Sequence, residues 1–140
     1  DDVAIIAARV PRLPAELRVS WPAETPALAG IRQLLRRWLR ERGASDDELY
    51  DITVACQEAC ANAVEHAYRP GRESFLVEAR CVDARVRVTV SDHGRWRPPR
   101  GDNRGRGLFM MRALMEHVDV RQTDGGTQVV LERTLAGAAA

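Results

Sequence analysis

Glu58 and Asn62 stand four residues apart in the stretch EACANAVEHAY (58–68). On a helix this spacing places a carboxylate and a carboxamide on the same face, where they could contact a polar ligand together. Small residues beside them leave room for such a ligand: Ala55, Ala59 and Ala61. The pattern alone leaves two interpretations open, namely the floor of a cleft or an ordinary solvent-exposed helix face.

Three short motifs follow in the second half of the chain. Asp92 ends an expected strand and precedes Gly94, where the backbone is unhindered. Gly105-Arg106-Gly107 opens an expected helix, and backbone N–H groups at a helix N-terminus suit a phosphate group. Thr127 begins the last expected strand, directly after Gly125-Gly126. Each motif is common by itself, so their order carries the information.

The composition limits the chemistry that is available. All 21 Lys+Arg residues of the 140-residue chain are arginine, which excludes a P-loop because that motif requires a lysine. Phosphate contacts must therefore come from arginine, backbone N–H groups, a helix N-terminus or a metal ion. The net charge of +1 gives no sign of direct nucleic-acid binding. No apolar run reaches the roughly 20 residues that cross a bilayer, so no membrane association is predicted.

The cysteines favour a cytoplasmic location. Cys56, Cys60 and Cys81 are odd in number and form no C-x-x-C motif. We interpret them as reduced, buried thiols rather than a metal site. A zinc or redox site built from Cys56, Cys60 and His66 is disfavoured, because the two thiols point to the side of the helix opposite Glu58 and Asn62.

Helical and alternating patterns predict an α+β domain with an antiparallel-rich sheet and helices on one face. The first helix is expected to begin at Thr25 as N-cap with Pro26 next, and to end at Gly43. A Ser45–Glu48 capping box predicts the start of the second helix, which we expect to reach about Tyr68. The remaining elements are a strand at 17–21, hairpins at 75–82/84–91 and 119–123/127–135, a loop at 92–107 and a helix at 108–118.

The second helix is predicted to divide into a polar side and a core side. The core side gathers mostly apolar residues: Leu49, Ile52, Cys56, Cys60, Ala63, Val64 and Ala67. Glu65 and His66 are interpreted as supporting or structural residues near the polar side.

The ordered motifs resemble the Bergerat-fold (GHKL) ATPases, whose fold is a two-layer α/β sandwich with a mixed, mostly antiparallel sheet. Within that superfamily, E58-A-C-A-N62-A-V-E-H66-A-Y68, S91-D-H-G94 and G105-R-G-L-F-M-M resemble the RsbW/SpoIIAB branch. Members of this branch are anti-sigma factors that are also serine/threonine protein kinases. The match covers about residues 17–135. The segment between Gly94 and Gly105 is short for an ATP lid.

The resemblance implies that ATP and Mg²⁺ are the cofactors and assigns a role to each matching residue. Glu58 matches the general base, and Asn62 matches the Mg²⁺ ligand. Asp92, Gly94 and Thr127 match residues around the adenine. Gly105 and Gly107, with the adjoining Leu108, match the end of the lid, where N–H groups meet phosphate. Arg104 and Arg106 are predicted phosphate contacts on chemical grounds.

The resemblance also implies partners: a STAS-type anti-anti-sigma protein as phosphoacceptor, a sigma factor, and a second copy of the chain. The arginine-rich face of the first helix is either a solvated face or a partner surface. An alternative function is a nucleotide-binding interaction module that sequesters a sigma factor or STAS partner with little or no kinase activity. A histidine-kinase interpretation is disfavoured, because none of His66, His93 and His117 lies on an upstream dimerisation helix.

The beginning of the chain carries a second resemblance. Asp1-Asp2-Val-Ala-Ile-Ile-Ala-Ala-Arg is similar to the closing strand of PPM/SpoIIE-like phosphatases. We therefore expect residues 1–12 to be the tail of a preceding domain with a linker, 13–135 to be the kinase domain, and 136–140 to be a tail or linker. This arrangement is expected of a multidomain sigma-factor regulator of actinobacterial type. One strand cannot form a phosphatase site, so no such activity is expected here.

Overall fold

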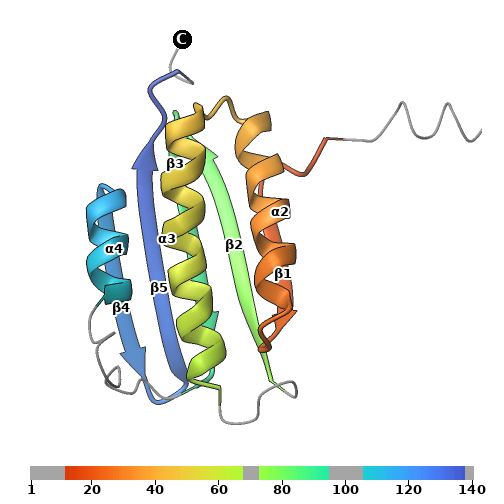
Figure 1. Ribbon diagram of the computed structural model, residues 1–140, viewed down its shortest axis with the longest axis vertical. Coiled ribbons are helices and arrows are strands. Elements are labelled where there is room, and N and C mark those ends of the chain that lie inside the picture. The colour runs from red at the N-terminus through yellow and green to blue at the C-terminus, as the bar shows by residue number, and fades with distance from the viewer. Residues whose placement is uncertain (1–11, 68–72, 95–105, 138–140) are drawn as a thin grey trace, which may run out of the picture.

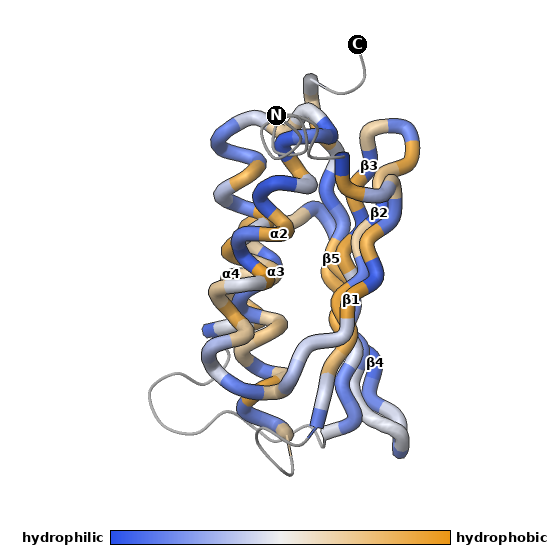
Figure 2. Tube along the Cα trace, turned by 90° about the vertical axis from the view of Figure 1, so that its right-hand side faces the viewer, coloured by the Kyte–Doolittle hydropathy of each residue, from blue (hydrophilic) through white to orange (hydrophobic). Residues whose placement is uncertain are grey.

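The computed structural model describes residues 12–67, 73–94 and 106–137, and these form two layers (Figure 1). One layer is a five-stranded sheet with strand order β1-β2-β3-β5-β4, in which neighbouring strands are antiparallel. Helices α2, α3 and α4 cover one face of this sheet, as the edge-on view shows (Figure 2). The elements are β1 (Leu17–Pro22), α2 (Ala27–Glu41), α3 (Asp46–Glu65), β2 (Ser74–Val82), β3 (Arg85–Asp92), α4 (Arg106–Leu114), β4 (His117–Thr123) and β5 (Gly126–Thr134). The predicted α+β sandwich is confirmed.

Period-two alternation explains the sheet. Along β3, Val86, Val88 and Val90 are buried against the helices, while the residues between them face the other side. The β2–β3 hairpin closes at Asp83 and Ala84, which both have positive φ, as a two-residue turn of this kind requires. Both predicted hairpins are confirmed.

The predicted N-cap of α2 is wrong, although the helix itself is confirmed. Pro26 occupies the cap position, and no side chain caps this end. The N–H groups of Ala27 and Leu28 instead donate to the backbone carbonyls of Glu24 and Thr25. This backbone turn satisfies the donors that a Thr25 hydroxyl would have capped. At the other end Gly43, with φ of 86°, ends the helix as predicted.

The capping box of α3 is confirmed at atomic detail. The Ser45 hydroxyl accepts the N–H of Glu48, and the Glu48 carboxylate accepts the N–H of Ser45. The other oxygen of that carboxylate accepts the N–H of Ala136, which ties the chain after β5 to the start of α3. The helix ends at Glu65, short of the predicted Tyr68, which lies outside the described residues.

The predicted helix at 108–118 is wrong at both ends. It begins at Arg106 and ends at Leu114, and His117 and Val118 belong to β4. Pairing with Glu132 and Leu131 of β5 satisfies the backbone of these two residues in a ladder. Tertiary pairing thus overrides a helical pattern that the local sequence would allow.

The core between the layers contains most of the predicted core face of α3. Leu49, Ile52, Cys56, Cys60 and Ala63 are buried, whereas Val64 and Ala67 are only partly so. Ala55 and Ala59 were expected to line either a cleft or a solvent-exposed face and are instead almost fully buried in the core. Their small size serves close packing at that position. Among the helices that the structure describes, none is long and apolar enough to span a membrane.

Candidate active site

Glu58 and Asn62 lie on α3 directly opposite the N-terminal end of α4. A Cβ atom placed on Gly107 would lie 3.2 Å from Oε2 of Glu58 and 3.6 and 3.7 Å from the side-chain atoms of Asn62. Both side chains are half-buried. The second position of α4 must therefore carry little or no side chain for the two helices to meet here. The sequence-predicted carboxylate, carboxamide and glycine are brought together.

The beginning of α4 provides an electropositive surface beside the Glu58 carboxylate. The first N–H groups of a helix have no partner inside the helix, and the aligned peptide dipoles place partial positive charge there. Arg106, the first residue of α4, is exposed at the same point. Leu108 is partly buried and packs against the hydrophobic core. This end of α4 suits an anionic ligand such as a phosphate group.

A second group of predicted residues meets where β3 ends and β5 begins. Oδ1 of Asp92 accepts the N–H of Gly94 at 2.8 Å, and Asp92 pairs with Thr127 across the sheet. Burial raises the pKa of the Asp92 carboxyl above its ordinary value, and hydrogen bonds from the N–H groups of Gly94 and Thr127 oppose part of that rise. The carboxylate is held in a fixed orientation as a hydrogen-bond acceptor.

Two glycines allow this second group to form. A Cβ on Gly94 would overlap the backbone carbonyl of His66 at the end of α3, and a Cβ on Gly126 would overlap the carbonyl of Asp92. Gly126 also has φ of 137°, a conformation that L-residues rarely adopt. Gly94 was a predicted site residue, whereas Gly126 was not. The Gly-Gly pair before Thr127 was the available signal, but a hairpin turn explains such a pair equally well.

Helix α3 connects the two groups. Asn62 contacts the Gly107 position, and His66, one helical turn later, packs its backbone against Gly94. His66 is buried, and its charge opposes the rise in the pKa of Asp92. One turn of helix advances about 5.4 Å, so the groups are neighbours along one helix. His66 therefore has the supporting position expected from the sequence.

The hydroxyl of Thr127 suits a polar ligand at this place. Thr127 is 3% exposed, and its Oγ1 atom is buried without a hydrogen-bond partner among the described residues. A buried hydroxyl without a partner is costly, and native proteins usually satisfy it with another group or with water. Together with the Asp92 acceptor, it fits a polar heterocycle such as adenine.

Two of the predicted residues cannot be placed. Arg104 and Gly105 lie outside the described residues, as does the 95–103 segment that precedes them. The same holds for the strand expected within residues 1–10.

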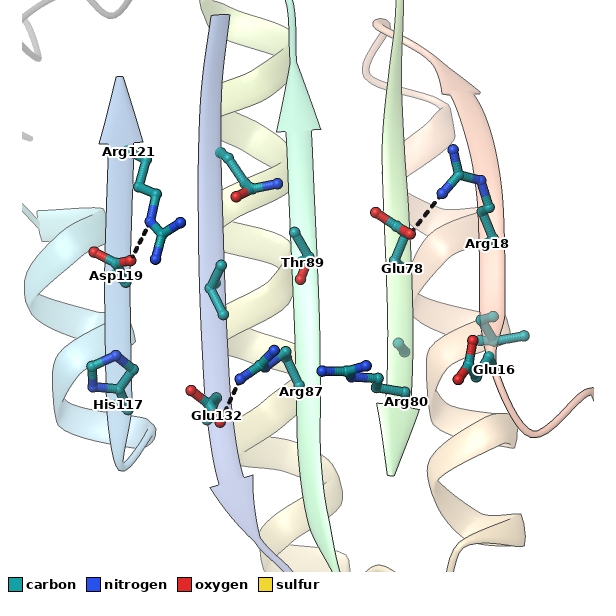
Figure 3. A pocket seen from close by; sticks show the side chains of 14 residues that line it. Glu16, Arg18, Glu78, Arg80, Arg87, Thr89, His117, Asp119, Arg121 and Glu132 are labelled. Atoms are coloured by element: carbon teal, nitrogen blue, oxygen red, sulfur yellow. Dashed lines mark hydrogen bonds and ion pairs between the residues drawn. The ribbon is translucent and has the colours of Figure 1, made fainter. Parts of the chain in front are cut away.

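A hollow of about 560 Å³ lies on the opposite, helix-free face of the sheet and contains none of the predicted site residues (Figure 3). Several of its charged side chains are already paired with each other, as in Arg18–Glu78 and Arg121–Asp119, both at 2.8 Å. Glu132 likewise pairs with Arg87 at 3.6 Å. The charges of these pairs neutralise one another between neighbouring strands and, for Arg121–Asp119, along β4, so the face is a solvated sheet surface rather than the nucleotide site.

The family model described as the histidine kinase-like ATPase domain matches residues 21–133. The chain belongs to this family. Among curated proteins it is similar to the serine-protein kinase RsbW of Staphylococcus epidermidis, with 30% identity over 125 residues that cover 76% of this chain and 79% of the relative. It is also similar to the serine-protein kinase RsbW of Bacillus subtilis, with 28% identity over 134 residues that cover 83% of each.

Solved structures agree with this assignment. The structure of the RsbU and RsbW domains of a Mycobacterium tuberculosis protein matches with a TM-score of 0.74 and 32% identity over 88% of this chain. The present chain spans 33% of that longer one. A histidine kinase domain from Erythrobacter litoralis matches in fold alone, with a TM-score of 0.52 and 21% identity. The chain is thus an ATP-dependent serine-protein kinase domain of the RsbW type, and the branch predicted from the sequence is confirmed.

Proposed function

We propose that this domain binds Mg·ATP between α3, the N-terminal end of α4 and the β3–β5 junction, and transfers phosphate to a serine or threonine hydroxyl of a protein partner. The observation that carries the proposal is the meeting of Gly107 with Glu58 and Asn62. A base, an oxygen ligand for a cation and an electropositive helix end converge there. These are the parts that phosphoryl transfer requires, because its catalysis consists mainly of positioning and charge stabilisation.

Each residue of the first group has a distinct task. Oε2 of Glu58 accepts the proton of the attacking hydroxyl as general base. The side-chain oxygen of Asn62 would hold Mg²⁺, a hard cation that prefers oxygen ligands. The N–H groups at the start of α4 bind phosphate oxygens, together with Arg104, Gly105 and Arg106. When bound, Mg·ATP supplies the phosphoryl group and neutralises the charge that develops during transfer.

The second group recognises the base. The Asp92 carboxylate accepts a hydrogen bond from the adenine amino group, and the Thr127 hydroxyl supplies a further polar contact. Gly94 and Gly126 let the backbone pack closely against the end of α3 and around Asp92, which keeps the Asp92 carboxylate in this place. The site should therefore prefer adenine to a base without this amino group, because the Asp92 acceptor stays unpaired when the ligand has no amino group to donate.

The proposed partners are a STAS-type anti-anti-sigma protein as phosphoacceptor and a sigma factor that the domain sequesters. The resemblance to the RsbW/SpoIIAB branch supports both, and a homodimer is proposed on the same ground. The exposed arginines of α2 are the candidate surface, although not all of them are available. Arg37 pairs with Glu41, and Arg42 lies over the Trp38 ring and donates to Pro14 O.

We also propose that residues 13–135 are the kinase domain, preceded by the tail of a phosphatase-like domain at 1–12 and followed by a tail or linker at 136–140. The similarity to a structure that joins RsbU and RsbW domains in one chain supports this organisation.

The test uses radiolabelled ATP, Mg²⁺ and a panel of STAS-domain proteins with the wild-type domain and Glu58→Gln. The isosteric amide cannot accept the proton, so transfer should fall at least about 100-fold while nucleotide binding is retained. Glu65→Gln, an exposed position on the same helix, is the matched control and should transfer normally. Full transfer by Glu58→Gln would remove Glu58 from the mechanism. Nucleotide binding by the wild type without transfer to any panel member would favour the interaction-module alternative.

Asn62 has a separate test. Asn62→Ala should weaken ATP binding in the presence of Mg²⁺ and change it little with EDTA. Equal losses under both conditions would show that Asn62 does not act through the metal ion.

A further inference from the structure

Arg133 is a charged residue on the helix-facing side of β5. Its neighbours on that side of the strand, Thr127, Val129 and Leu131, are all buried, and its cross-strand partner is the buried Val86. Only 21% of the Arg133 side chain is exposed. A guanidinium placed between two packed layers is costly unless it is paired and hydrogen-bonded.

The partners of Arg133 come from two different helices. Its Nη1 atom donates to Oδ2 of Asp51 on α3 and, at 3.0 Å, to the carbonyl of Leu114, the last residue of α4. That carbonyl is one of the last four of a helix, which have no partner inside the helix, and a cation at this end is favoured. One guanidinium therefore joins β5, α3 and the C-terminal end of α4.

The contact between α3 and α4 through Arg133 and their contact at Gly107 are separated by the same number of residues on both helices. The helices run in opposite directions side by side (Figure 1). Asp51 meets the end of α4 at Leu114 through Arg133, and Glu58 meets the beginning of α4 at Gly107. Seven residues separate the two contact points on each helix, a distance of about 10.5 Å along each axis. The guanidinium contact at one end therefore determines where Gly107 lies at the other.

We infer that Arg133 is a positioning residue for phosphoryl transfer: it holds the N-terminal end of α4 in register with Glu58 and Asn62. This inference rests on the proposed function of that site. Two buried methionines, Met111 in α4 and Met115 directly after it, provide apolar contacts that tolerate sliding, since methionine is flexible. The hydrogen bond to Leu114 specifies one register. A slip of one residue moves a helix about 1.5 Å, and a misplacement of about 1 Å can reduce a rate by about 100-fold.

Arg85 provides a matched control for a purely structural role. It lies at the start of the neighbouring strand β3, on the opposite face of the sheet, and its Nε atom pairs with Glu132 at 2.7 Å. Loss of either arginine removes an ion pair made by a strand residue, but only Arg133 contacts the helices that form the site.

The experiment compares Arg133→Met, Arg133→Lys and Arg85→Met with the wild type, below the unfolding temperature of the least stable variant. Mant-ATP and mant-ADP affinities are measured with Mg²⁺, followed by kcat and KM for transfer to the STAS-domain protein that the wild type phosphorylates. In Arg133→Met we expect kcat to fall at least tenfold at saturating ATP, with mant-ADP affinity within about threefold. Arg85→Met should keep wild-type values, and Arg133→Lys should recover part of kcat because it retains the charge but not the planar guanidinium geometry.

Arg133→Met with wild-type kcat and KM, however much less stable, would overturn the inference and reduce Arg133 to a structural contact. Equal losses of kcat in Arg133→Met and Arg85→Met would overturn it as well. Glu58→Gln is assayed alongside. If that variant also transfers normally, the proposed function has failed, whereas normal transfer by Arg133→Met alone contradicts only the positioning role.

Discussion

Gly107→Ala should separate activity from stability. The residue has an ordinary helical φ, so alanine fits the backbone, and replacing glycine within a helix stabilises it by up to about 1 kcal/mol. For a domain of this size that amounts to a rise in Tm of about 4 °C at most. The new methyl group would nevertheless lie 3.2 Å from Oε2 of Glu58, so that the carboxylate must move by a few tenths of an ångström.

The activity should change in the other direction. A displacement of about 1 Å can cost about 100-fold in rate, so a smaller one combined with a methyl group beside the N–H groups of α4 should reduce transfer by about tenfold. ATP affinity should fall with it, because the methyl group also obstructs phosphate at the helix end.

The assay measures thermal unfolding, mant-ATP affinity and transfer rate on the same preparations. Ala113→Gly, on the exposed side of α4, is the reciprocal control. It should lower stability by up to about 1 kcal/mol and leave transfer unchanged. A Gly107→Ala protein that transfers phosphate at the wild-type rate would refute the placement of the phosphates at this end of α4.

Three further outcomes are expected. Thr127→Val should keep or raise stability, because it removes a buried hydroxyl that has no partner among the residues the structure describes, yet it should weaken mant-ATP binding. Unchanged affinity would contradict the adenine contact. Burial raises the pKa of Asp92, so ionisation of this carboxyl lowers the free energy of unfolding as pH rises from about 4 through the raised pKa. ATP affinity should improve over the same pH interval, because the ionised carboxylate is the better acceptor. Asp92→Asn should abolish both trends in pH-dependent unfolding and binding titrations. Burial alone would raise the pKa of Glu48, but hydrogen bonds from Ser45 and Ala136 outweigh burial and lower the pKa. The stabilisation of the fold by the ionised Glu48 carboxylate is therefore lost as pH falls below about 4. Glu48→Gln should cost about 1–3 kcal/mol in urea unfolding near pH 7, and an unchanged midpoint would refute the anchoring of the C-terminal segment.

The sequence predicts the end of a helix or strand correctly where that end depends on residues only a few positions away in the chain. The Ser45–Glu48 capping box and the hairpin that turns at Asp83 are confirmed, with Ala84 also in the turn, because a cap or a tight turn requires particular side chains or φ angles within a few positions. The end of α4 was wrong for the complementary reason. The residues after Leu114 have a helical pattern, but β5 offers them a pairing partner that no local window contains.

In the candidate site too, some features could be predicted from local spacing and others depend on tertiary packing. The pairing of Glu58 with Asn62 and the turn at Asp92–Gly94 could be identified from spacing, because helix geometry and a short loop fix those relations. The burial of Ala55 and Ala59 could not, since an alanine on a helix is equally suited to a cleft and to a tight contact. Gly126 was not recognised from the sequence as a residue that this place requires. What distinguishes it from an ordinary hairpin glycine is that a Cβ atom there would overlap the Asp92 carbonyl, and only the structure shows this.

The sequence by itself determined the order and chemistry of the motifs, and through them the family and the candidate site residues. Those properties depend on residue type and on spacing within single elements. Only the tertiary structure decided that α4 meets α3 at Gly107 and that Arg133 ties the opposite ends of the same helices together. It also decided that the Thr127 hydroxyl is buried with no hydrogen-bond partner in the described part of the chain. These relations join residues up to 82 positions apart, and they follow from how the layers pack, which no single segment encodes.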